Sequence, residues 1–113
     1  MKLNEMQLYS ALNEYIDREM MPLGATMKMT DQFFFGVKMG IVKRRLQEII
    51  KGYLYKPELK AFGIVDENGY VDIDLLYQSA SDTMSQMNQL DIAGFTFKLS
   101  DLQNLYGVMQ RYA

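Results

Sequence analysis

The segment 30–54 constrains the fold most, because its apolar residues recur at helical spacing and predict one long helix. Thr30 is expected to cap this helix, with Asp31 facing the positive end of its dipole, and Pro57 follows its expected end near Leu54. One broad arc is expected to face the core: Phe35, Met39, Val42, Leu46, Ile49, Ile50 and Tyr53. The first half is also apolar on the opposite side, through Phe33, Phe34, Val37 and Ile41. A helix that is apolar all round requires burial all round.

Two glycines, Gly36 and Gly40, lie four residues apart in the same half of this helix. Each costs helix stability by up to ~1 kcal/mol, so close approach of another backbone is the expected compensation. Methionines cluster around Phe33–Phe35, as they do at adaptable binding surfaces: Met20, Met21, Met27, Met29 and Met39. We therefore expect a homo-oligomer whose interface contains Phe33, Phe34, Gly36, Val37, Gly40 and Ile41.

Two other interpretations of the apolar second side remain open. The chain's own first helix, expected over residues 4–20, would cover it in an ordinary core. A helix lying on a membrane surface is less favoured, because residues 31–42 lack a polar face rich in Lys and Arg.

The rest of the chain predicts alternating short elements. Residues 61–65 and 70–73 flank Asn68-Gly69, which is typical of a tight β-hairpin. Asp74 is expected to cap a helix that carries Leu76, Ala80, Met84 and Met87 and fades near Asn88. Residues 95–99 alternate as a strand, and Ser100 begins a capping box before a helix with an apolar stripe: Leu102, Leu105, Tyr106, Met109 and Tyr112.

This order predicts a helix-rich α+β fold in a single domain, residues 1–113. Two N-terminal helices are followed by a β-hairpin, a helix, a strand and a helix, with a small three-stranded mixed sheet. The mixed sheet follows from the strand–helix–strand segment, which allows the second and third strands to pair in parallel.

Composition removes several classes of chemistry. The chain has no Cys and no His, which excludes disulfides, the usual zinc sites, thiol catalysis and a Ser-His-Asp triad. No phosphate-binding loop or nucleophile motif is present. We expect a non-enzymatic protein without a cofactor. The absence of an export signal and of Cys favours the cytoplasm, and no segment is apolar enough to predict a membrane span.

A basic segment gives the alternative function. Residues 38–60 have a net charge of +5, whereas the whole chain has −2. Cations beside aromatic rings can bind a phosphate backbone and stack on bases, so an alternative is a nucleic-acid-binding accessory protein that uses Lys43, Arg44, Lys51, Lys56 and Lys60. Glu48 is spaced to pair with neighbouring cations and the chain lacks an overall basic excess, so this alternative is not favoured.

Carboxylates at 66, 72 and 74 suggest a third class, a metal-dependent enzyme. The run from Asp66 to Asp72 resembles the middle of an EF-hand calcium loop. The first ligand position falls on Ile64 and the closing glutamate position on Leu75, which removes the essential oxygens. A plain turn explains the same residues, and no metal site is predicted.

Overall fold

The computed structural model covers residues 1–113 and describes all of them except 88, 93 and 94. The structure is helix-rich, as predicted, and its helices are α1 (Glu5–Tyr15), α2 (Met29–Leu54), α3 (Pro57–Ala61), α4 (Ile73–Met87) and α5 (Leu99–Tyr112). The strands are β1 (Lys2–Leu3), β2 (Val71–Asp72), β3 (Gln89–Ile92) and β4 (Phe95–Lys98). A π-helical stretch (Ile16–Met20) and a 3₁₀ turn (Met21–Gly24) join α1 to α2.

The predicted helix over 4–20 is confirmed as α1 together with the π-helical stretch. Asn4 caps it, because its side-chain oxygen accepts a hydrogen bond from the Gln7 amide at 2.8 Å. The long second helix is also confirmed, but Thr30 does not cap it. The residue before the helix is Lys28. The Gln32 side chain stabilises the preceding turn by donating a hydrogen bond to the Met27 carbonyl at 2.9 Å.

The predicted element order and the predicted sheet are both wrong in detail. Strand β1 precedes the two long helices, and α3 lies between α2 and the turn at Gly69. In the described residues the strands form two separate antiparallel pairs, β1 with β2 and β3 with β4. The expected hairpin is reduced to one bridge between Val65 and Val71, because β2 pairs with the N-terminal strand instead. The turn itself is confirmed, with Gly69 at φ +81°. The predicted parallel pairing does not form, because β4 pairs with β3, which directly precedes it in the chain. Strands joined by so short a connection pair antiparallel.

Two of the predicted helix starts are displaced. Helix α4 begins at Ile73. The Asp72 carboxylate, rather than that of Asp74, accepts hydrogen bonds from the free amides of its first turn. Helix α5 begins at Leu99, so Ser100 lies inside it. Asp101 still acts at this helix start, because its carboxylate accepts from the Lys98 amide at 2.8 Å.

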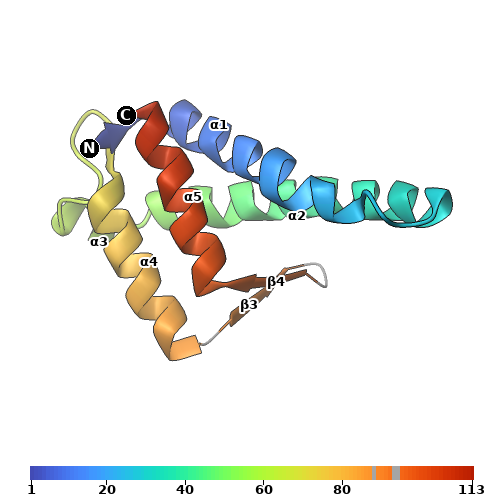
Figure 1. Cartoon of the computed structure of the whole chain (residues 1–113). Coiled ribbons are helices and arrows are strands. Elements are labelled where there is room, and N and C mark those ends of the chain that lie inside the picture. The colour runs from blue at the N-terminus through green and yellow to red at the C-terminus, as the bar shows by residue number, and fades with distance from the viewer. Residues whose placement is uncertain (88, 93–94) are drawn as a thin grey trace.

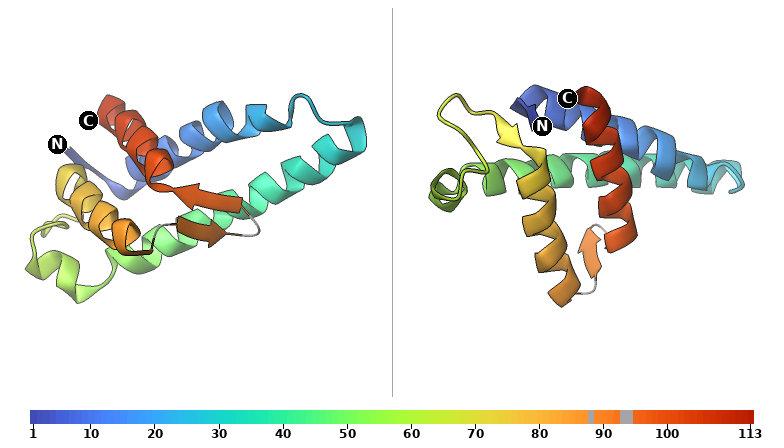
Figure 2. Two further views of the ribbon diagram at one scale, coloured as in Figure 1. Left: turned by 60° about the horizontal axis from the view of Figure 1, so that its bottom comes forward. Right: turned by 60° about the vertical axis from the view of Figure 1, so that its left-hand side comes forward.

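The core lies where α4 and α5 cross the helical hairpin formed by α1 and α2 (Figures 1 and 2). Tyr15 is buried there at 1% exposure, its ring edge-on to Phe97, and its hydroxyl donates to Asp101 at 2.9 Å. Desolvation by burial raises the pKa of Tyr15, and the hydrogen bond to the Asp101 carboxylate raises it further. The hairpin continues beyond this core, and the molecule measures 48 × 28 × 21 Å.

Candidate interaction surface

The part of the helical hairpin that extends past the core forms an arm, which we define as residues 16–41 (Figure 1). Its inner side is well packed, since Met20 and Met39 are 2% and 1% exposed. Phe35 lies directly on Gly24, where a Cβ would come within 2.6 Å of the Phe35 ring. The backbone of the 3₁₀ turn therefore approaches α2 closely, and Gly24 is required for that approach.

The outer side of the arm is apolar and exposed. We call this surface the outer stripe: Phe33, Phe34, Gly36, Val37, Gly40 and Ile41. Phe33 and Phe34 are 68% and 67% exposed, and their rings meet edge to face with centroids 5.6 Å apart. Val37 and Ile41 continue the same side at 50% and 36% exposure. The first helix covers the opposite side of α2, so it does not bury these residues.

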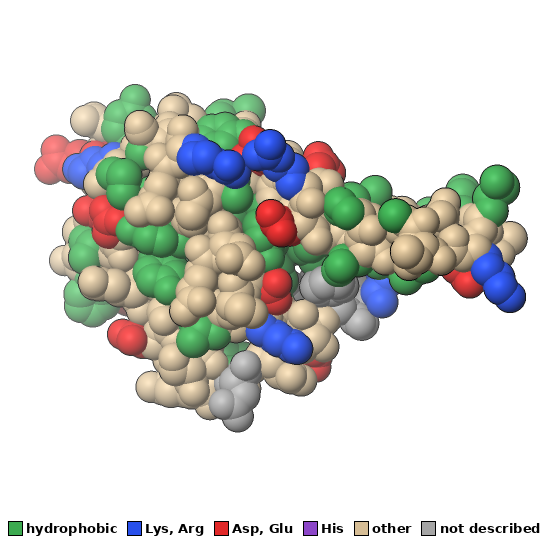
Figure 3. Space-filling view, in the orientation of Figure 1, with side chains coloured by type: hydrophobic (Ala, Val, Ile, Leu, Met, Phe, Trp, Pro, Cys, Tyr) green, Lys and Arg blue, Asp and Glu red, His purple; other side chains and the backbone are tan. Residues whose placement is uncertain are grey.

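The outer stripe is comparable in size to the largest apolar patch that a typical monomer exposes. At about 200 Å² for each aromatic side chain, Phe33 and Phe34 alone expose roughly 270 Å². The largest apolar patch on a typical monomer is about 300–600 Å², and such patches are often functional. Leu23, Met27 and Met29 extend the exposed apolar surface to the end of the arm, and Figure 3 shows hydrophobic side chains along this projecting part.

The two glycines of the outer stripe have no steric partner in the described chain. A Cβ at Gly36 or at Gly40 would meet no described atom within 4 Å. Close approach of the chain's own backbone, which explains Gly24, therefore does not explain them. The helix keeps two destabilising residues on a side where its backbone is open to an approaching partner.

The basic segment does not present its five predicted residues as one free cluster. Lys43 pairs with Asp17 of the π-helical stretch, Nζ to Oδ1 at 2.7 Å. Arg44 and Lys51 are exposed and seven residues apart, hence on one side of α2. Lys56 lies 5.8 Å from the centre of the Tyr53 ring, and Lys60 is on α3 beyond the end of α2. Among the described residues, no ion pair joins Glu48 to the neighbouring cations, so the expected pairing there is absent.

The three carboxylates suggested for metal chemistry are each engaged in local structure. The pKa of Asp66 is lowered, chiefly by the hydrogen bond from the Tyr70 amide, with the Asn68 amide and Lys2 also donating to it. Asp72 accepts from the first amides of α4, as described above. Within the part of the chain that the structure describes, no three such side chains converge on a metal position.

Asp74 joins the N-terminus to α5 instead of capping a helix. Its carboxylate accepts a hydrogen bond from the Tyr106 hydroxyl and contacts the Met1 ammonium at 3.1 Å. The hydrogen bond from Tyr106 is the main reason that the pKa of Asp74 is lowered, and the ammonium group contributes as well. The same contact raises the pKa of Tyr106. These groups fasten β1 and α4 to the C-terminal helix.

The chain matches no known protein family, and no curated protein or solved structure matches it. In the described residues, none of the helices combines the length and apolarity needed to cross a bilayer. The candidate surface therefore has to be judged on its own geometry. The sequence predicts the six residues of the outer stripe from an apolar pattern wider than one helix face, and the structure leaves Phe33, Phe34, Val37 and Ile41 exposed. Their role as an interface stays a prediction.

Proposed function

We propose that this protein is a non-enzymatic, cytoplasmic interaction protein that self-associates through the outer stripe. The observation that carries the proposal is the exposure of Phe33 and Phe34 beside two glycines whose backbone faces open space. Removing these rings from water supplies the driving force, at roughly 25 cal/mol per Å² of apolar surface. A standard interface buries about 800 Å² per partner, so the stripe forms the apolar centre of a larger contact.

A second copy of the chain is the occupant that fits the stripe best. When two α2 helices cross antiparallel about a two-fold axis near Val37, residues at equal distances on either side of Val37 meet. Phe34 then lies near Gly40 of the second copy, and Phe33 near Ile41 of the second copy. The Phe34 ring opposes a glycine in this arrangement, which lets the two helices approach closely.

Nucleic-acid binding remains the weaker proposal. Lys43 is already neutralised by Asp17, and the chain as a whole is acidic with a net charge of −2. A phosphate-binding surface would give retention on heparin that falls steeply with salt. Elution at low salt without retention excludes this alternative.

Sedimentation equilibrium at tens of micromolar protein tests the self-association. Wild type is expected to be a dimer or higher oligomer, and Phe34→Glu and Val37→Glu are expected to be monomers with unchanged helicity. Phe62→Glu is the matched control, because Phe62 is 74% exposed but lies outside the arm. A monomeric wild type at this concentration contradicts the proposal, as does a Phe34→Glu variant that still assembles like the control.

A further inference from the structure

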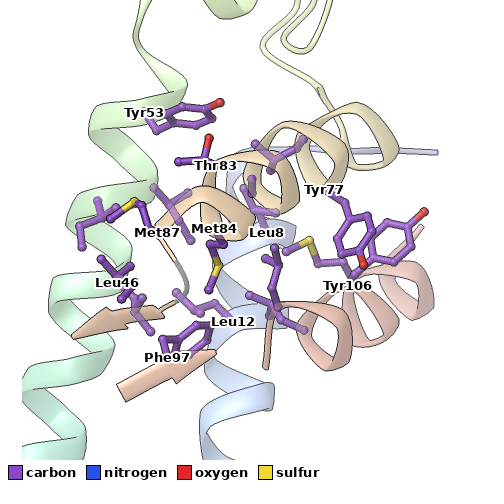
Figure 4. A pocket seen from close by; sticks show the side chains of 18 residues that line it. Leu8, Leu12, Leu46, Tyr53, Tyr77, Thr83, Met84, Met87, Phe97 and Tyr106 are labelled. Carbon is purple, nitrogen blue, oxygen red and sulfur yellow. The ribbon is translucent and has the colours of Figure 1, made fainter. Parts of the chain in front are cut away.

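An apolar cavity of about 320 Å³ lies between the four long helices and the β3–β4 hairpin (Figure 4). Leu8 and Leu12 of α1 and Met84 of α4 surround its middle, and Phe97 lies at one end. These residues are buried: Leu8, Leu12 and Phe97 are 0%, 1% and 4% exposed. The outer stripe does not line this cavity, so the two features are independent.

The cavity has an opening to solvent between α2 and α4. Ile49 and Met87 line it at 48% and 53% exposure, and Thr83 lies on the same side. Thr83 and Tyr53 sit together at the end opposite Phe97 (Figure 4). A molecule from solution can therefore enter the cavity from this side.

The lining offers little to a charged molecule or to water. None of the described lining residues is charged. The hydroxyl of Tyr53 is bonded to the Ser79 hydroxyl at 2.7 Å, and that of Thr83 donates to the Ser79 carbonyl at 3.0 Å. The Tyr106 hydroxyl donates to Asp74. Water is held in cavities by two or more polar partners, and apolar cavities without them stay dry and bind apolar molecules.

We propose that this cavity binds one uncharged apolar molecule of roughly 10–12 non-hydrogen atoms, an aliphatic chain or a pair of fused rings. The size follows from the volume, which is about twice that of a ~150 Å³ cavity that holds one benzene. A helix of a partner protein is too wide, because an α-helix with its side chains is about 10 Å across. The cavity also falls in the ordinary size range of small-molecule sites, about 300–1,000 Å³.

Titration with the uncharged fluorescent probe 1-aminonaphthalene, a pair of fused rings, followed by displacement with 1-decanol, tests the proposal. We expect saturable binding of one probe per chain and full displacement. At 100 times its dissociation constant, 1-decanol should raise the Tm by roughly 10 °C. The variant Ala80→Leu fills the cavity and is expected to weaken probe binding at least tenfold, whereas Ala61→Leu, on the exposed side of α3, leaves it unchanged.

If Ala80→Leu does not fold, Leu76→Phe replaces it, since Leu76 also lines the cavity. Non-saturable binding, or equal binding by the variants at 80 and 61, overturns the proposal. So does loss of binding as the protein concentration rises, because a second copy would then fill the opening. The variant Phe34→Glu is expected to bind the probe like wild type, which separates this site from the self-association surface.

Discussion

Replacing both glycines of the outer stripe with alanine has opposite consequences for the subunit and for the assembly. Alanine is favoured over glycine in a helix interior by about 0.8–1 kcal/mol, and both positions have open space for a Cβ. The variant Gly36→Ala/Gly40→Ala should therefore stabilise the isolated subunit by roughly 1.5–2 kcal/mol. For a chain of 113 residues, 1 kcal/mol corresponds to a Tm shift of about 4 °C. At protein concentrations below the dimer dissociation constant, the Tm of the double variant should therefore rise by about 7 °C.

The same substitution should weaken the dimer. The added methyl at Gly40 occupies the position where Phe34 of the second copy packs, and overpacking a fitted contact costs about 1–3 kcal/mol. Since 1.4 kcal/mol is a factor of ten, the dimer dissociation constant is expected to rise by about 5- to 150-fold. Sedimentation velocity over a concentration series measures this change, and melting at 0.5 μM measures the subunit.

Gly52→Ala is the matched control, because Gly52 is also in α2 with no described atom within 4 Å of a Cβ. It should raise the subunit Tm by up to about 4 °C and leave assembly unchanged. A double variant that dimerises as tightly as Gly52→Ala would refute the close-approach reasoning. A double variant with a lowered subunit Tm would show that the backbone at these positions is not open.

Three further predictions follow from the packing and the titrating groups. Gly24→Ala should lower the free energy of unfolding by about 1–3 kcal/mol, because its Cβ would come within 2.6 Å of Phe35; urea titration measures this, and an unchanged midpoint would contradict it. The pKa of Asp66 is lowered, so its contribution to stability is present above the ordinary value of 3.8 and is lost as the pH falls through the lowered pKa. Asp66→Asn should therefore flatten the fall of Tm below pH 4. A variant whose Tm profile runs parallel to that of wild type would argue against this contribution. The pKa of Tyr15 is raised, so the free energy of unfolding should decline as the pH rises above about 10. Tyr15→Phe should reduce this decline and should cost about 1 kcal/mol at pH 7, because the hydrogen bond to Asp101 is lost. An unchanged alkaline decline in thermal melts would contradict the assignment.

The elements predictable from sequence are those with long apolar periodicity. The helices over 4–20 and 30–54 and the stripe from Leu102 to Tyr112 carry several turns of pattern, which outweighs local exceptions. The two-residue strand β1 has no periodicity to detect, and its pairing with β2 depends on a contact between distant parts of the chain. That contact is also what reduces the predicted hairpin around Asn68-Gly69 to a single bridge.

The start of α4 could not be predicted from the local sequence. Asp72 and Asp74 are two residues apart and both suit a helix start, and only the tertiary contact of Asp74 with Tyr106 decides which one caps α4. The apolar second side of α2, in contrast, could be predicted from helical spacing alone, and its exposure is what the structure adds. The cavity was not predictable, since its walls come from elements far apart in the sequence.

Disulfide trapping tests the self-association most directly, because the chain has no cysteine of its own. In the variant Val37→Cys, the new thiol lies next to the two-fold axis, where the Cα atoms of two copies fall within the ~7 Å that a disulfide allows. Mild oxidation should convert most of this variant to a covalent dimer with unchanged helicity. Met6→Cys, at a position on α1 that is 72% exposed, should remain largely monomeric on a non-reducing gel. If the Val37→Cys variant crosslinks no more than the Met6→Cys variant, the outer stripe is not the surface through which two copies meet.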